Sequence, residues 1–270
     1  MTALTAERRH RFAWLGLVMV ALALRFWELG LRTMSHDESL HAFYSFRLAT
    51  EGAYQHDPAY HGPLLYHLNA LVFFLVGASD VTARMVPSLA GAALVAGLWW
   101  WRRYLGAAGA WLAAACITFS PSLLFYSRHI RNDIYIAALT LVWAYAVLRY
   151  LEEPHPRWRA LLMSVMALSF ACKEVSFITG AVIGSFVVLL VLGGRRRTPA
   201  RAEAALDLAV LMLTLVLPFA AGALFPLFGW PPVGEATRQA LTGAGGLVVA
   251  GLFVVAGVAG AARFGLRPWL

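Results

Sequence analysis

The segment "LLYHLNALVFFLVG" at residues 64–77 decides the predicted topology of this chain. If the segment crosses a membrane, every later loop lies on the opposite side from the one it would occupy if the segment did not cross. At a rise of 1.5 Å per residue, a helix over this segment covers about 21 Å, which is short of the ~30 Å hydrocarbon core of a bilayer. The segment also contains His67 and Asn69, two polar residues in an otherwise apolar run. The sequence leaves two options, a further span or a helix that lies at the membrane surface.

The composition predicts a membrane protein with several spans. Of the 270 residues, 60% are hydrophobic and only 13% are charged, and a soluble domain of this size could not bury so much apolar surface. The apolar runs are about 17–22 residues long and show no alternation, which favours helices over a β-barrel. We therefore predict an all-α, polytopic transmembrane helical bundle, with the N-terminal apolar run retained as a signal-anchor helix.

Eight spans can be marked along the sequence, and together they predict a single membrane domain over residues 1–270. Residues 12–192 form its core, with a loop at 32–83, and residues 206–261 add further spans. The expected spans are 12–31, 84–101, 105–121, 134–151, 160–172, 175–192, 206–229 and 240–261.

The positions of the basic residues decide between the two options for segment 64–77. If the segment does not cross, fourteen Lys and Arg residues fall on the cytoplasmic side and seven on the other side, with Arg25 inside the first span. If it crosses, the counts become eight and thirteen. Cytoplasmic loops carry an excess of Lys and Arg. The sequence therefore predicts a juxtamembrane helix at 64–77, eight spans, and both termini in the cytoplasm.

The net charge of +8 does not indicate a nucleic-acid-binding protein. The excess comes mostly from Arg clusters at the ends of the predicted spans, where such clusters set orientation. No basic stripe is interleaved with exposed aromatic residues, as nucleic-acid binding would require. We expect no nucleic acid among the partners.

The predicted topology gathers acidic and His-rich segments on one extracytoplasmic face. These segments are "SHDE" (35–38), "HDPAYHGP" (56–63), "SRHIRND" (127–133) and "CKE" (172–174). Loops held by a scaffold commonly carry function, and ionisable groups near membrane depth are costly unless they are used. The sequence therefore predicts a functional site on this face of a cell membrane protein.

Asp37 and Glu38 are the first candidates for chemistry. A pair of carboxylates at the end of a span can simply be solvated. Here the pair is surrounded by aromatic residues and histidines and opens a long loop. A carboxylate at an apolar boundary suits a general base.

Basic residues that could clamp a phosphate group follow in the next two loops. Arg128 and Arg131 offer donor forks that fit phosphate oxygens, and Asp133 can orient an Arg or the substrate. Lys173 would add a further cation at the same membrane boundary, next to Glu174. The alternative for these side chains is ordinary snorkelling at the interface.

A metal ion is an open alternative within this face. His36 and His41 are five residues apart, and the sequence reads His-Asp-Glu, so the zinc-protease pattern is absent. If a metal is bound, its ligands would come from Asp37, His41, Asp57 and His61, and a divalent ion assisting a phosphate leaving group would be the expected type. Otherwise we expect no cofactor.

Three motifs give the chain a resemblance to a known family. They are "SHDES.H" after the first span, "YHGPLLYHLNAL.FFLVG.SD.TAR..PSLAG", and "SPS.LFYSR.IRND.Y", in a match that runs from about residue 12 to 180. The chain resembles the membrane glycosyltransferases of the GT-C type, which include protein O-mannosyltransferases and the lipid A aminoarabinose transferase. It is most similar to the branch of flippase activity-associated proteins of N-glycosylation clusters. Such proteins are usually about twice as long, so we expect this chain to correspond to their N-terminal half.

The resemblance implies a sugar donor linked to polyprenyl phosphate and a protein or glycolipid acceptor on the extracytoplasmic side. It also implies a catalytic Asp in the first loop and a second acidic residue in the next, which fall on Asp37, with Glu38 beside it, and on Asp133. The expected phosphate ligands are Arg128, Arg131 and Lys173, and the expected pocket residues are His36, His41, Asp57, His61 and Glu174. Asp37 would take the proton from the acceptor hydroxyl, with inversion at the sugar carbon.

Two other functions compete with the transferase. A non-catalytic subunit that binds or helps to flip lipid-linked sugars would use the same cations without needing a base. It would act with a separate C-terminal half or a larger glycosylation complex. A solute transporter would instead place ionisable residues near the bilayer midplane. The polar groups of this sequence gather at one rim, which disfavours the transporter.

Overall fold

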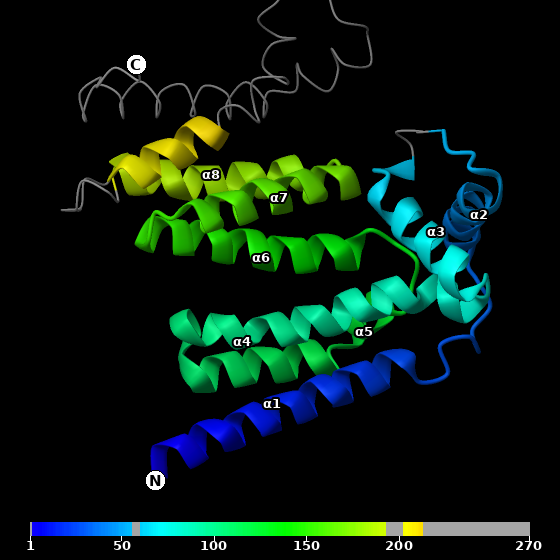
Figure 1. Ribbon diagram of the computed structural model, residues 1–270, viewed down its shortest axis with the longest axis horizontal. Coiled ribbons are helices and arrows are strands. Elements are labelled where there is room, and N and C mark those ends of the chain that lie inside the picture. The colour runs from blue at the N-terminus through cyan, green and yellow to red at the C-terminus, as the bar shows by residue number, and fades with distance from the viewer. Residues whose placement is uncertain (1, 56–59, 193–201, 213–270) are drawn as a thin grey trace, which may run out of the picture. The chain divides into compact units, whose positions relative to one another are not determined.

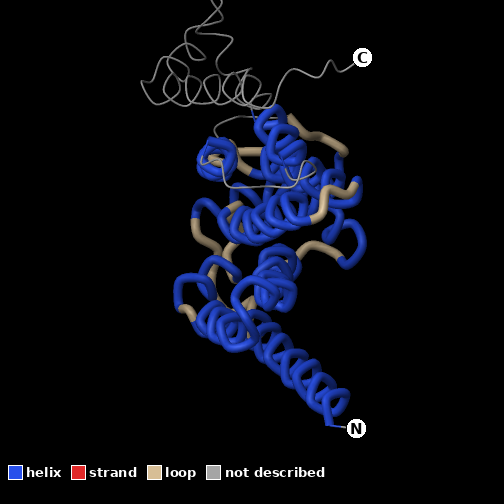
Figure 2. The backbone as a smooth tube through the Cα atoms, turned by 90° about the vertical axis from the view of Figure 1, so that its left-hand side faces the viewer, coloured by secondary structure: helices blue, strands red, loops and turns tan. Residues whose placement is uncertain are grey.

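The computed structural model describes residues 2–55, 60–192 and 202–212, and this part of the chain is built of helices and connecting loops (Figure 2). The prediction of an all-α fold is confirmed there. Asp57 and the predicted span 240–261 lie outside the described residues, as does most of the predicted span 206–229.

Eight helices have defined ends, and residues 202–212 are helical as well. Their bounds are α1 Thr2–Phe26, α2 His36–Glu51, α3 Leu64–Val76, α4 Asp80–Phe119, α5 Pro121–Ser127, α6 Asp133–Glu152, α7 Pro156–Cys172 and α8 Ser176–Leu192. Within the described ranges, α4 and α6 are long and apolar enough to cross a membrane. The number of spans stays a prediction.

The described residues fall into two compact units. The described residues of the first unit are 2–55, 60–145 and 164–174, and those of the second are 146–163, 175–192 and 202–212. All the described residues that the sequence analysis proposed for the site belong to the first unit.

Helix α4 contains a sharp break at Gly106, where two predicted spans meet. Gly106 has φ 70° and ψ 171°, a conformation outside the helical range that glycine adopts readily. Within α4 the ribbon turns back on itself (Figure 1). Trp14 of α1 packs against Trp99 before the break and Trp111 after it, with ring centroids 5.5 and 5.0 Å apart. The predicted spans 84–101 and 105–121 therefore form a helical hairpin.

The first helix ends five residues earlier than the predicted span 12–31. It stops at Phe26, and Glu28 has a positive φ of 47°. Carbonyl groups in the turn that follows the helix accept hydrogen bonds from two arginines. Arg128 donates to Trp27 and Glu28, and Arg84 donates to Leu29. These side chains satisfy the free carbonyl groups at the helix end.

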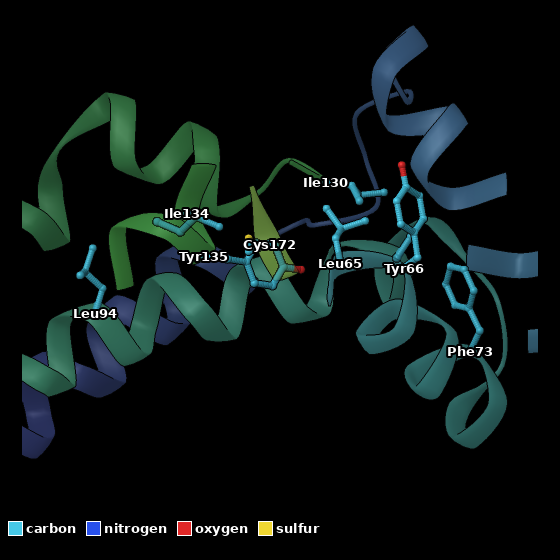
Figure 3. Packing of buried hydrophobic residues seen from close by; sticks show 9 residues of the cluster. Leu65, Tyr66, Phe73, Leu94, Ile130, Ile134, Tyr135 and Cys172 are labelled. Atoms are coloured by element: carbon cyan, nitrogen blue, oxygen red, sulfur yellow. The ribbon is translucent and has the colours of Figure 1, made fainter. Parts of the chain in front are cut away.

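Helices α2 and α3 lie at one end of α1 and α4 and are inclined to them (Figure 1). Leu65, Tyr66 and Phe73 of α3 are buried in a cluster that also includes Ile130 and Cys172 (Figure 3). The opposite face of α3 is apolar and exposed at Leu71, Phe74 and Leu75. The 13 residues of α3 fall within the predicted segment 64–77, and its position at the membrane surface stays a prediction.

Candidate functional site

Glu38 is a buried carboxylate in the first turn of α2. Ser35 is the N-cap, and its hydroxyl accepts a hydrogen bond from the Glu38 N–H (3.4 Å), while the Ser35 N–H donates to Glu38 Oε2 (3.0 Å). This reciprocal arrangement is a capping box, for which Ser-x-x-Glu is the sequence signature. The motif "SHDE" therefore begins α2 and turns Glu38 back toward the N-cap.

Arg84 of α4 neutralises Glu38 in the protein interior. Its Nε and Nη2 donate to the two carboxylate oxygens at 2.9 and 3.2 Å, and both side chains are essentially inaccessible to solvent. Arg84 Nη1 donates to the carbonyl oxygens of Leu29 and Arg32 at 3.0 and 2.8 Å. A buried charge is tolerated only when it is paired and hydrogen-bonded, and this pair meets that condition. Arg84 thereby ties α4 to α2 and to the segment after α1.

Arg32 and His129 complete the surroundings of Glu38. Arg32 Nη2 lies 2.7 Å from Glu38 Oε2 and 2.8 Å from His129 Nδ1. Because an arginine only donates, Nδ1 of His129 must accept and carry no proton, which leaves the proton on Nε2. Burial lowers the pKa of His129; the charge of Glu38 opposes this effect, and Arg32, Arg131 and Arg84 add to it. The imidazole is therefore neutral at pH 7.

The pKa of Glu38 reflects two opposing effects. Burial alone would raise it, but the hydrogen bonds from Arg84 and the Ser35 N–H, with the charge of Arg84, outweigh burial and lower the pKa. Glu38 is therefore ionised at neutral pH, and both of its carboxylate oxygens accept hydrogen bonds. This arrangement suits a structural anion better than a group that must accept and release a proton.

Asp37, one residue before Glu38, lies in a different environment. Its side chain is 50% exposed, and Oδ2 accepts from Arg131 Nη1 at 2.6 Å. Arg131 Nε lies 3.3 Å from Asp133 Oδ2, and Lys173 Nζ donates to Asp133 Oδ1 at 2.9 Å. We call Asp37, Arg131, Asp133 and Lys173 the carboxylate–cation cluster. It brings together four predicted site residues from α2, the α5–α6 connection, α6 and the turn after α7.

His41 lies on the buried side of α2. Its Nδ1 is 2.8 Å from the Tyr66 hydroxyl, which in turn donates to the Tyr60 carbonyl oxygen at 3.1 Å. Burial, with a smaller contribution from the charge of Arg131, lowers the pKa of His41 to about 4. The imidazole is therefore neutral at pH 7 and packs within the core next to the predicted site.

His61 and Glu174 meet where the connection before α3 touches the turn after α7. His61 Nδ1 lies 3.0 and 2.9 Å from the two oxygens of Glu174. The neighbouring Gly62 N–H donates to the Cys172 carbonyl oxygen at 3.1 Å, and Asn132 Nδ2 donates to the same oxygen at 2.9 Å. Three segments far apart in sequence are therefore joined at the end of α7.

Replacing Gly62 by alanine is expected to disrupt this junction. A Cβ at position 62 would lie 2.1 Å from the Ala171 carbonyl oxygen, a backbone atom that cannot move aside cheaply. Overpacking of this kind typically costs about 1–3 kcal/mol. We expect Gly62→Ala to lower the midpoint of thermal unfolding of the purified protein in detergent. Gly16→Ala is the control, because a Cβ there would meet nothing within 4 Å. Equal midpoints for Gly62→Ala and wild type would contradict the packing described.

The remaining predicted residues are placed differently. His36 is exposed in the first turn of α2. Arg128 binds the carbonyl groups of Trp27 and Glu28 after α1 and is not part of the carboxylate–cation cluster. Among the described side chains, no group of three or more His, Cys, Asp or Glu is arranged to hold a metal ion. The metal alternative, which included Asp57, stays a prediction.

Sequence reasoning did not single out Arg84 and Arg32 as partners of Glu38. Arg32 and Arg84 entered only the count of basic residues on the extracytoplasmic side. Two signals could have found Arg84 and Glu38. The capping box predicts that Glu38 points back toward the preceding segment, and Arg84 is the only charged residue between Val81 and Trp101. An arginine in such an apolar run is expected to have an acidic partner, and Asp80, four residues earlier, is the local alternative to Glu38.

Comparison with protein families gives a match over more than half of the chain. Residues 60–221 match the family described as dolichyl-phosphate-mannose-protein mannosyltransferase. The match includes Arg131, Asp133 and Lys173 and begins after Asp37 and Glu38. A comparison with curated proteins finds no match. The chain therefore belongs to the dolichyl-phosphate-mannose-protein mannosyltransferase family.

Proposed function

We propose that this chain is a membrane glycosyltransferase that moves a sugar from a polyprenyl-phosphate donor to an acceptor hydroxyl on the extracytoplasmic face. The family match supports a transferase that uses a lipid-phosphate sugar. The observation that carries the finer proposal is the position of Arg131 between two carboxylates, 2.6 Å from Asp37 and 3.3 Å from Asp133.

In this mechanism Asp37 is the general base. Its exposed carboxylate can reach an acceptor hydroxyl, and Arg131 fixes its orientation. The acceptor oxygen forms a bond to the anomeric carbon, and the hydroxyl proton passes to Asp37. The bond between that carbon and the phosphate oxygen breaks, and its electron pair leaves with the polyprenyl phosphate. A displacement of this kind inverts the sugar carbon.

Arg131 and Lys173 stabilise the leaving phosphate. Lys173 carries three N–H groups and needs only one for Asp133, and the Arg131 guanidinium offers five. Both cations can therefore bind phosphate oxygens while they keep their carboxylate partners. Fixed donors aimed at developing negative charge are commonly a large contribution to catalysis. Asp133 acts as a positioning residue, because it contacts both cations.

The reaction can be tested with purified protein in lipid nanodiscs, dolichyl-phosphate mannose and an acceptor peptide rich in serine and threonine. The expected result is release of free dolichyl phosphate that depends on the acceptor. Binding of the donor without release, with peptide or glycolipid acceptors, would contradict the transferase. That outcome would favour the non-catalytic alternative, a lipid-linked-sugar subunit of a glycosylation pathway.

A further inference from the structure

The pair formed by His61 and Glu174 has a defined arrangement of protons. Both oxygens of Glu174 lie within 3.0 Å of His61 Nδ1, and a carboxylate can only accept. Nδ1 must therefore carry a hydrogen. In a neutral imidazole the other nitrogen, Nε2, then has a lone pair and accepts hydrogen bonds. Glu174 thus selects the tautomer in the same way that carboxylates orient histidines in many active sites.

The backbone conformation at His61 and Gly62 fixes the position of the His61 side chain. His61 has a φ of 67°, in the left-handed region that is uncommon for residues other than glycine. Gly62 is pressed against the end of α7, where its N–H binds the Cys172 carbonyl oxygen. A residue persists in such a conformation only when its surroundings determine it strongly, and such residues concentrate at functional sites. The His61 side chain is therefore directed by the fold.

The His61 ring is linked to the carboxylate–cation cluster through Glu174. Glu174 holds His61 Nδ1 and is adjacent in sequence to Lys173, which binds Asp133. The His61 side chain is 25% exposed. Among the described residues, no hydrogen-bond partner is seen for Nε2. In its neutral form, the partly exposed His61 ring therefore offers an acceptor nitrogen next to Glu174, whose neighbour in sequence is Lys173 of the proposed donor site.

We propose that His61 Nε2 accepts a hydrogen bond from a hydroxyl of the donor sugar, and that Glu174 is the residue that positions the ring. This assignment rests on the function proposed above. A nitrogen lone pair repels phosphate oxygens, which the nearby cations bind, whereas it matches a sugar hydroxyl, which donates. His61 is then a specificity-determining residue for the sugar attached to the lipid phosphate.

Donor binding tests the assignment without requiring turnover. Equilibrium binding to the full chain in nanodiscs would be measured with dolichyl-phosphate mannose, with its 2-, 3-, 4- and 6-deoxymannose analogues, and with dolichyl phosphate. The variants are His61→Ala and Glu174→Ala. The matched control is His67→Ala, because His67 is also exposed and its Nδ1 lies near the Pro63 carbonyl oxygen, on α3.

The expected loss of affinity for dolichyl-phosphate mannose is about tenfold for His61→Ala, the usual scale for one hydrogen bond, and smaller for Glu174→Ala. The loss caused by His61→Ala should nearly vanish for the one deoxy analogue that lacks the hydroxyl bound by Nε2, and for dolichyl phosphate, which has no sugar. His67→Ala should bind every ligand as the wild type does. An equal loss for all the ligands, no loss, or no mannose-dependent binding by the wild type would overturn the assignment. Selective binding without release of dolichyl phosphate would overturn only the proposed transferase.

Discussion

Asp37→Asn is expected to lower the rate of sugar transfer by about 10²–10⁴-fold, which is the usual contribution of a positioned general base. The amide has the shape of the carboxylate, and its oxygen can still accept from Arg131, which lies 2.6 Å from the native Asp37 oxygen. An amide cannot take a proton from the acceptor hydroxyl. The measurement is the initial rate of acceptor-dependent release of dolichyl phosphate.

The fold should survive this substitution. The contact between Asp37 and Arg131 is half-exposed, and ion pairs of that kind contribute about 0–1 kcal/mol. Asp80→Asn is the matched control, because Asp80 is an exposed carboxylate in the first turn of α4 and should be dispensable for transfer. Transfer at the wild-type rate by Asp37→Asn would remove Asp37 from the role of base.

Glu38→Ala is expected to be the most destabilising of the substitutions considered, by about 3–5 kcal/mol of unfolding free energy. The variant leaves the buried Arg84 guanidinium without its carboxylate and removes the anion that Arg32 also binds. The capping box of α2 is lost at the same time. Unfolding in detergent, followed by circular dichroism, measures this effect.

Two further variants separate the buried charge from other effects. Glu51→Ala is the matched control on the same helix, because Glu51 is exposed and, among the described residues, pairs with Arg47 alone, so its loss should change little. The double variant Glu38→Leu with Arg84→Met removes both buried charges and should recover part of the stability. A Glu38→Ala protein as stable as Glu51→Ala would show that Glu38 does not anchor the fold.

The pH dependence supplies a second readout of the same pair. The pKa of Glu38 is lowered in the folded state from its ordinary value of 4.5. Its contribution to stability is therefore complete above pH 4.5 and is lost as the pH falls through the folded-state pKa. The difference in unfolding free energy between wild type and Glu38→Ala should accordingly shrink below pH 4.5.

The apolar runs alone predicted the helical fold and several helix positions. The prediction succeeded for α6, α7 and α8 because long uninterrupted apolar runs with Gly and Pro at their ends have few alternatives to helix. The end of α1 could not be predicted in the same way. It depends on Arg84 and Arg128, which bind carbonyl groups after Phe26 from more than fifty residues away.

The sequence by itself also determined that Asp37, Arg131, Asp133 and Lys173 are unusual for an apolar chain, because charges are rare there without partners or a function. Only the tertiary structure decided which of the adjacent carboxylates, Asp37 and Glu38, is buried and which is exposed. Successive residues on a helix point about 100° apart, so Glu38 enters the interior to meet Arg84 while Asp37 faces Arg131 and solvent. Which of the two side chains is buried depends on where α4 packs against α2. The contact between Glu38 and Arg84 joins residues 46 positions apart, so the local sequence around Glu38 does not predict it.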